Sequence, residues 1–252
     1  MSKAHQIHHS IAFSDLEAQV PGSVVQIDGH EAHHAVRVKR VRVGDHIRLL
    51  DGQGRIASGV VRDIGGSKSK PRFDLELRCI DTYPPITPVV EVYSALPKAD
   101  RLDRMIDQLT QIGITTYRPL VCDRSQRKPA TIRPDKLARI ATEASKQCHR
   151  PWGLDIGDPI AFDDAISDPD ALLADASGDP IGNSSARART VVLIGPEGGW
   201  TDRERELADE RGVQTVRFGL FIFRIETAAC AISSVVLAHA SPIQSSSASK
   251  PT

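Results

Sequence analysis

Hydrophobic residues follow two different patterns along the chain, separated by a proline-rich break. Over the first eighty residues, short β-rich runs alternate with Asp-Gly and Gly-Gly turns, which is typical of a small antiparallel sheet or barrel. The predicted elements of this part are strands at Val24–Ile27, His46–Leu50, Ile56–Ile64 and Phe73–Ile80 and one helical turn at 30–36. Pro84, Pro85 and Pro88 end the pattern, because each proline removes a backbone donor and fixes φ. The break predicts one domain over 1–82 and a second over 83–243.

Beyond the break, strands and amphipathic helices alternate. The clearest helix covers 98–112, where apolar residues recur at intervals of three and four and Gly113 follows as the C-terminal cap. A second helix begins at Pro134, and a capping box of Thr201 and Glu204 begins a third. The other predicted elements are strands at 89–95, 114–121, 190–194 and 213–218 and a closing helix at 226–240, with the third helix over 202–211. Alternation of this kind favours an α/β domain with a mostly parallel sheet.

Two polar segments predict less regular structure. Residues 155–186 are rich in Asp, Pro, Gly and Ser, which predicts a short helix around 161–175 followed by a mobile surface loop. The serine-rich residues 244–252 are predicted to form a disordered tail.

Composition and charge narrow the class of protein. The chain has 252 residues, 40% of them hydrophobic and 25% charged, which fits a soluble globular protein and excludes a collagen or a disulfide miniprotein. Net charge is zero, but residues 98–150 hold 12 basic and 6 acidic residues, whereas 151–186 hold 8 aspartates and no Lys or Arg. Such asymmetry points weakly to nucleic acid. Four cysteines without CxxC pairs and no apolar stretch long enough for a membrane predict a cytoplasmic protein.

The strongest local signal is the loop Leu193–Trp200, in which the turn Gly195–Trp200 follows a predicted strand. Ligands bind at the carboxyl ends of strands in α/β sheets, and the glycines let the backbone approach a flat ligand closely. The turn is neither a dinucleotide fingerprint nor a phosphate loop. On spacing alone, a turn that merely connects a strand to a helix is the commoner explanation.

A second signal, Phe218–Thr227, also lies between a predicted strand and a helix and is expected beside the first turn. Glu226 and Thr227 suit the N-terminus of a helix, so capping explains them. Arg224 stands between apolar residues and needs a partner, which could be a carboxylate, a carbonyl or a ligand.

Histidines and basic residues gather near the start of the chain. His30, His33 and His34 have no accompanying ligand set with tetrahedral spacing, so a polar helical turn is favoured over a metal site. A run of cations interleaved with valines then predicts either one solvated strand face or a surface that contacts phosphate. The cations of this run are Arg37, Lys39, Arg40 and Arg42.

Several of these blocks together resemble the bacterial ribosomal RNA small subunit methyltransferase E family. The resemblance runs from about His30 to His239. It is carried by residues 33–40, by Ala95-Leu96-Pro97-Lys98 with 107–113, by Glu143-Ala144 and 147–150, and above all by Ile194-Gly195-Pro196-Glu197-Gly198-Gly199-Trp200 and Arg224-Ile225-Glu226-Thr227-Ala228.

The resemblance implies a small N-terminal PUA-like β-barrel that binds RNA and a C-terminal SPOUT α/β domain tied in a trefoil knot. It implies S-adenosylmethionine-dependent methylation of N3 of a uridine in 16S rRNA, by a homodimer without metal that acts on rRNA or on the small ribosomal subunit. The cofactor residues implied are Leu96, Leu193, Ile194, Gly195, Gly199, Phe218, Gly219, Ile222, Phe223 and Thr227. Arg224 and Glu197 are the candidate catalytic residues. The expected RNA-binding residues are Arg37, Lys39, Arg40, Lys98 and Arg101.

The chain departs from the family pattern in one place, and two alternative functions are also compatible with the sequence. Phe221 stands where the family usually has Arg, and Phe223 where it has Leu, which puts substrate affinity in question. Another SPOUT-class RNA methyltransferase, acting on a ribose 2′-oxygen or a guanine, is the nearest alternative. A non-catalytic RNA-binding or ribosome-assembly module is the second.

Overall fold

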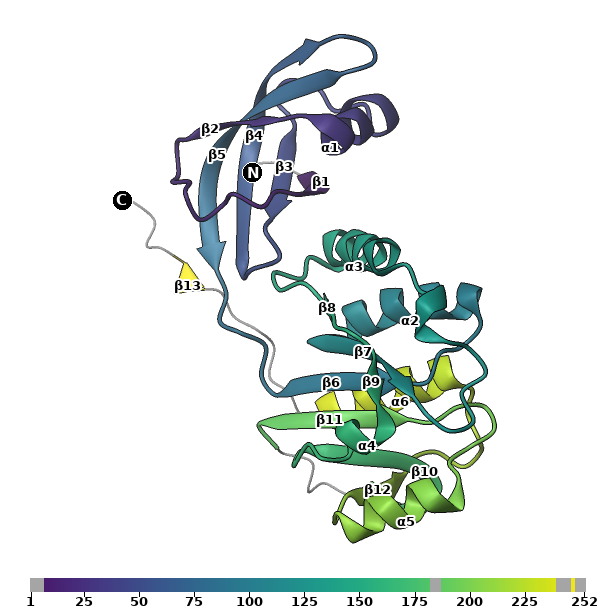
Figure 1. Ribbon diagram of the computed structural model, residues 1–252. Coiled ribbons are helices and arrows are strands. Elements are labelled where there is room, and N and C mark those ends of the chain that lie inside the picture. Colours follow the sequence, from purple (N-terminus) through teal and green to yellow (C-terminus); the bar gives the residue numbers. More distant parts are fainter. Residues whose placement is uncertain (1–6, 182–186, 239–245, 248–252) are drawn as a thin grey trace. The chain divides into compact units, whose positions relative to one another are not determined.

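The computed structural model describes residues 7–181, 187–238 and 246–247 and divides the chain into two compact units (Figure 1). The first unit contains the residues up to Pro85, the segment Ser145–Trp152 and the short strand at Ser246–Ser247. The second contains Ile86–Ala144 and the residues from Gly153 to 238. Sequence reasoning expected one boundary near residue 82 and did not expect Ser145–Trp152 in the first unit.

The first unit is a six-stranded, mostly antiparallel sheet with a short helical segment. Its strands are β1 (Ile7–Ala12), β2 (Val24–Ile27), β3 (His46–Leu50), β4 (Arg55–Gly66), β5 (Pro71–Thr82) and β13 (Ser246–Ser247). They pair in the order β1-β3-β4-β5-β13, and β2 also pairs with β5. Alternate residues of the strands, such as Leu49, Leu75 and Leu77, point into a core that excludes water. The strands predicted from the alternating pattern are confirmed, and β1 was missed.

Ser145–Trp152 attaches to this sheet through side chains and backbone. The indole Nε1 of Trp152 donates to the Pro84 carbonyl at 2.7 Å, and Gln53 forms a bridge with Trp152. The Lys146 ammonium, 8% exposed, pairs with Glu31 at 2.9 Å. A buried lysine needs such a carboxylate to keep its charge, so this segment is an integral part of the first unit.

The second unit is a parallel sheet in the order β12-β10-β11-β6-β7-β8. Its strands are β6 (Val89–Ser94), β7 (Thr116–Val121), β8 (Asp155–Ile156), β9 (Ile160–Ala161), β10 (Ala171–Pro180), β11 (Arg189–Ile194) and β12 (Gln214–Arg217), of which β9 pairs with β7. The helices are α2 (Ala99–Ile112), α3 (Pro134–Cys148), α4 (Phe162–Ala165), α5 (Asp202–Glu210) and α6 (Ile225–Leu237), and η2 (Pro129–Thr131) is a short 3₁₀ turn. The last residues of α3, from Ser145 on, belong to the first unit. The α/β class with a parallel sheet is confirmed.

Local chemistry explains where the helices begin and end. α2 buries Leu102, Met105, Ile106 and Leu109 on one face and stops at Gly113, whose φ of 108° is left-handed. At α5, the Thr201 hydroxyl accepts from the Glu204 N–H and the Glu204 carboxylate accepts from the Thr201 N–H. Both predicted caps are confirmed.

Three predictions are wrong. Residues 161–175 do not form one helix followed by a loop, because only α4 is helical and Ala171–Pro180 is the sheet strand β10. The cations after His34 do not lie on a strand, since α1 (Gly29–His33) continues into a π-helical turn, η1 (His34–Val38). The predicted tail 244–252 contains the strand β13, which pairs with Thr82 and Asp81 of β5; its other residues lie outside the described part of the chain.

Several aspartates of 155–186 pair with arginines of the second unit. Arg189 lies 2.8 Å from Asp168 and 3.2 Å from Asp170, and Arg205 lies 3.0 Å from Asp175. Hydrogen bonding to Arg189 lowers the pKa of Asp168. Much of this acidic charge is therefore compensated within the fold.

Candidate functional site

The candidate site lies where the loops after β6 and β11 leave the sheet. These neighbouring parallel strands end in register at Ser94 and Ile194, and the Ala95 N–H continues the ladder to the Ile194 carbonyl at 2.9 Å. Parallel strands carry their loops on one edge. The chain segments Ala95–Lys98 and Gly195–Trp200 are therefore held side by side.

A pocket opens at this edge between four segments of the second unit. It is lined by Ala95, Leu96, Lys98, Ser125, Gln126, Arg127, Pro196, Glu197 and Ile225. Of the predicted site residues, the structure brings Leu96, Lys98 and Glu197 together here. Ile225 follows Arg224 directly, so the segment before α6 also reaches the pocket as expected.

The turn after β11 is fixed by a tryptophan. Trp200 is 2% exposed, and its Nε1 donates to the Ala174 carbonyl of β10 at 3.0 Å. A Cβ added at Gly195 would lie 2.8 to 3.1 Å from the Trp200 ring. Gly199 has a φ of 69°, a left-handed conformation that favours glycine. The conformation of the turn therefore requires glycine at both positions, Gly195 and Gly199, which were predicted as cofactor-binding residues.

A second anchor comes from the loop after β7. The Arg124 guanidinium donates to the carbonyls of Gly198 and Trp200 at 2.9 and 3.1 Å. The next residue, Ser125, accepts from the Cys122 N–H at 2.9 Å and so closes a turn. Burial raises the pKa of the Cys122 thiol to about 12, so this thiol is not a nucleophile near neutral pH.

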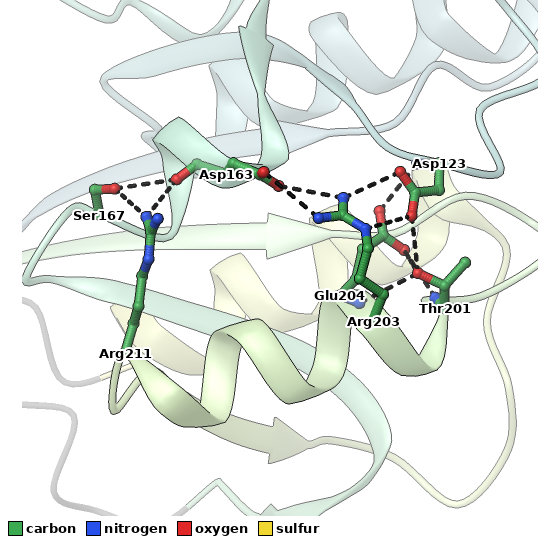
Figure 2. Close-up of polar contacts among 7 residues, drawn as sticks. All are labelled: Asp123, Asp163, Ser167, Thr201, Arg203, Glu204 and Arg211. Atoms are coloured by element: carbon green, nitrogen blue, oxygen red, sulfur yellow. Dashed lines mark hydrogen bonds and ion pairs between the residues drawn. The ribbon is translucent and has the colours of Figure 1, made fainter.

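Figure 2 shows how the start of α5 is tied to this loop. Glu204 is fully buried, and its carboxylate accepts from the Asp123 N–H at 2.9 Å and from the Thr201 N–H at 2.7 Å. Arg203 bridges Asp123 and Asp163, and its hydrogen bonds lower the pKa of Asp123. The turn before α5 and the loop after β7 therefore form one connected polar network.

Two carboxylates and an arginine lie beside the pocket. Arg101 lies 3.3 Å from Glu197 and 3.6 Å from Glu226. The second oxygen of Glu226, Oε2, is buried without a hydrogen-bond partner. Arg101, one of the predicted RNA-binding residues, thus forms ion pairs with both carboxylates.

The segment before α6 presents apolar side chains to solvent. Leu220, Phe221 and Ile222 are 82 to 91% exposed, whereas Phe223 packs against Phe218 with ring centroids 5.8 Å apart. Within the described chain, no backbone N–H of 219–223 donates to another backbone carbonyl. Gly219 has a φ of 81°. Arg224 is exposed at the N-cap of α6 and is not one of the residues that line the pocket.

The predicted RNA contacts of the first unit lie on and just after η1. Arg37, Lys39 and Arg40 are exposed, and Arg37 donates to the Lys68 carbonyl at 2.9 Å. Arg40 has a φ of 58°. His30, His33 and His34 lie in the same helical segment, as predicted.

Neither a metal group nor a membrane helix is found in the described residues. No three His, Cys, Asp or Glu side chains there could hold an ion together. None of the helices in the same ranges is long and apolar enough to span a membrane.

One of the four segments that line the pocket was missed by sequence reasoning. Ser125, Gln126 and Arg127 follow β7, which was predicted as a strand. Because β7 pairs with β6 in parallel, its carboxyl end had to lie at the same edge as Leu96. The expected parallel pairing of these two strands could therefore have shown that the loop after β7 belongs to the site.

Comparisons with known proteins agree on a family. Residues 85–237 match the family described as RNA methyltransferase domain, and residues 27–70 match the RNA methyltransferase PUA domain. A ribosomal RNA small subunit methyltransferase E of Synechocystis sp. is 28% identical over 221 residues, covering 83% of this chain and 71% of the relative. The protein of that name in Mycobacterium tuberculosis is 29% identical over 225 residues, covering 82% and 84%.

Solved structures show the same fold. A methyltransferase of Legionella pneumophila, solved with its bound cofactor SAM, matches with a TM-score of 0.80 at 20% identity, over 92% of this chain and 98% of that chain. A ribosomal RNA small subunit methyltransferase E of Neisseria gonorrhoeae, bound to S-adenosyl methionine, matches with a TM-score of 0.77 at 22% identity, over 91% and 97%.

Proposed function

Because this chain belongs to the RNA methyltransferase family, we propose that it transfers a methyl group from S-adenosylmethionine to N3 of a uridine in 16S rRNA. The observation that carries the proposal is the pocket at the carboxyl edge of the sheet, where Leu96, Glu197 and Ile225 meet with three nitrogen-bearing side chains. The names of the relatives support ribosomal RNA of the small subunit as the substrate.

The residues present fit a methyl donor held by main-chain atoms. The backbone N–H groups of 219–223 are free of other backbone carbonyls in the described structure, and Gly195 and Gly219 keep side chains out of the two turns. The buried oxygen Oε2 of Glu226 can accept a hydrogen bond from an N–H or O–H group of the bound molecule. When bound, S-adenosylmethionine supplies an electrophilic methyl group on sulfur. We assign its binding to the ten residues predicted from the family, from Leu96 to Thr227.

Uridine N3 carries a proton, so the protein must remove it before the nitrogen can attack. In our proposal, Glu197 accepts this proton and Arg224 stabilises the negative charge that spreads onto O2 and O4. The N3 electron pair then forms the new N–C bond. S-adenosylmethionine, held by the residues assigned above, would supply the methyl carbon of this bond, and its sulfur would keep the electrons of the C–S bond and become a neutral thioether.

Replacing Arg224 with alanine is expected to lower the single-turnover rate about 100-fold, with little change in the affinity for S-adenosylmethionine. The Arg224 side chain is exposed and makes no hydrogen bond or ion pair within the described structure, so the variant should fold normally. Rapid-quench kinetics on 16S rRNA and calorimetry with the donor measure the two quantities. An unchanged single-turnover rate would remove Arg224 from the chemistry.

The cations of the first unit are proposed to hold rRNA phosphates, together with Lys98 and Arg101 of the second. Arg40→Ala should weaken RNA binding and reduce the slope of log affinity against log salt concentration by about 1, because one phosphate contact is lost. Filter binding over a salt series measures the slope. Arg78→Ala is the matched control, since Arg78 pairs with Glu76 at 3.1 Å. Equal slopes for the two variants would contradict the assignment of Arg40.

The remaining features of the proposal come from the family resemblance. They are a barrel-like RNA-binding domain over 1–82, a SPOUT domain over 83–243 tied in a trefoil knot, a homodimer and a place in the cytoplasm. The apolar side chains of residues 220–222 are more than four-fifths exposed. Such exposure supports the proposal that this segment contacts a partner, such as the second chain of a homodimer.

Nucleoside mass spectrometry tests the proposal. Small ribosomal subunits that lack the modification are incubated with the protein and methyl-labelled S-adenosylmethionine, and the labelled nucleoside is identified and mapped. We expect label in 3-methyluridine of 16S rRNA. Label in a 2′-O-methylribose or a methylguanine would show the alternative methyltransferase, and absence of both label and donor binding would show an RNA-binding module.

A further inference from the structure

Arg127 is a cation that the fold holds in place at the pocket. It lies between β7 and α3, in the loop that Arg124 and Glu204 anchor. One of its guanidinium nitrogens, Nη1, donates to the Pro97 carbonyl, and the other, Nη2, donates to the Thr131 hydroxyl at 3.2 Å. A guanidinium tied at both ends is already oriented before a substrate arrives.

The charge of Arg127 is not neutralised by a carboxylate. Throughout the part of the chain that the structure describes, no Asp or Glu oxygen lies within ion-pair distance of Arg127. Arg101, by contrast, is paired with both Glu197 and Glu226. A guanidinium has five N–H donors, and Arg127 uses two of its nitrogens for the fold. It therefore lines the pocket with spare donors and with a positive charge that forms no ion pair among the described residues.

The polar groups around Arg127 complement an imide. A uracil presents an acceptor, a donor and an acceptor along O2, N3 and O4, so its site needs donors on both sides of an acceptor. The pocket contains the donors Lys98, Gln126 and Arg127 and the acceptor Glu197. The anion formed at N3 shares its charge between two oxygens, which leaves room for one cation on each side.

We propose that Arg127 is a catalytic residue that donates to one carbonyl oxygen of the uracil and stabilises its anion from the pocket wall, while Arg224 serves the other oxygen. This inference rests on the proposed uridine-N3 activity. It adds a residue from the loop after β7 to the site and predicts that uracil is selected over cytosine, which has no imide proton.

Arg127→Ala is expected to lower the single-turnover rate about 100-fold and to leave the affinity for S-adenosylmethionine within about twofold. Arg127→Lys keeps the charge and should lose less. Arg133→Ala is the matched control, because Arg133 is an exposed arginine nearby that does not line the pocket. Thermal unfolding of each variant shows whether the fold is kept.

A second substrate separates a catalytic role from a structural one. A fluorine at C5 makes the uracil N3 more acidic, so RNA that carries 5-fluorouridine at the target needs less help in forming the anion. The loss of rate caused by Arg127→Ala should therefore be smaller on this RNA. On RNA with normal uridine, the rate of the Arg127→Ala variant should level off at a higher pH than that of the unmodified protein.

Three results would overturn the assignment of Arg127. They are a rate within about twofold of the unmodified protein, a defect of equal size on both RNAs, and a loss explained wholly by weaker donor binding. The proposed function fails separately, if the unmodified protein forms no 3-methyluridine.

Discussion

Replacing Gly195 with alanine is expected to weaken binding of S-adenosylmethionine at least about tenfold and to lower the free energy of unfolding by about 1–3 kcal/mol. The new Cβ would lie 2.8 Å from the Trp200 ring. This ring cannot move aside cheaply, because it is buried, hydrogen-bonded to Ala174 and packed against Phe162 with centroids 5.1 Å apart. The backbone of the turn must shift instead, which displaces the atoms proposed to hold the donor.

Gly198→Ala is the control for this prediction, since it adds the same methyl group to the same turn. Its Cβ would lie 3.4 Å from Cδ of Arg124, an ordinary contact, and its φ is not left-handed. Calorimetry with the donor and denaturant unfolding measure both effects. Equal donor affinity in the two variants would show that the turn at Gly195 does not bind the donor.

Glu204→Gln is expected to lower the free energy of unfolding by about 2 kcal/mol. The buried carboxylate accepts from the Asp123 N–H through Oε1 and from the Thr201 N–H through Oε2, and Oε2 lies 3.0 Å from the Thr201 hydroxyl (Figure 2). An amide of the same shape places an NH₂ group at one of these oxygens. One backbone N–H is then left without an acceptor in the interior, where an unpaired polar group is costly.

Glu206→Gln provides the comparison, because Glu206 is exposed on the same helix. Urea unfolding of both variants gives the difference in stability. We also expect Glu204→Gln to slow methyl transfer, since the network positions the loop that carries Arg127. Equal stability of the two variants would mean that Glu204 makes no net contribution through this network.

Local sequence rules predicted the helix ends and most strands. Gly113 and the Thr201–Glu204 capping box act within one turn of the chain, so their effects can be recognised from neighbouring residues. β10 was missed for the opposite reason. Ala171–Ala174 is a short apolar run within an aspartate-rich segment, and only its pairing with β11 and β12 makes it a strand.

The candidate site was predicted in part. Sequence reasoning identified Leu96, Lys98 and Glu197, and the structure gathers them at one pocket. It did not identify Arg127, whose importance comes from tertiary contacts with Pro97 and Thr131. The sequence also shows Arg101 and Lys98 only as two basic residues. In the structure, Arg101 pairs with two carboxylates and Lys98 is exposed.

A crystal structure of the protein with S-adenosylmethionine and a short RNA containing the target uridine is the most direct test. We predict the donor against the turns at 195–199 and 218–223, with its methyl group directed at the pocket and the uracil oxygens facing Arg127 and Arg224. A donor bound elsewhere, or a uracil that contacts neither arginine, would contradict this arrangement.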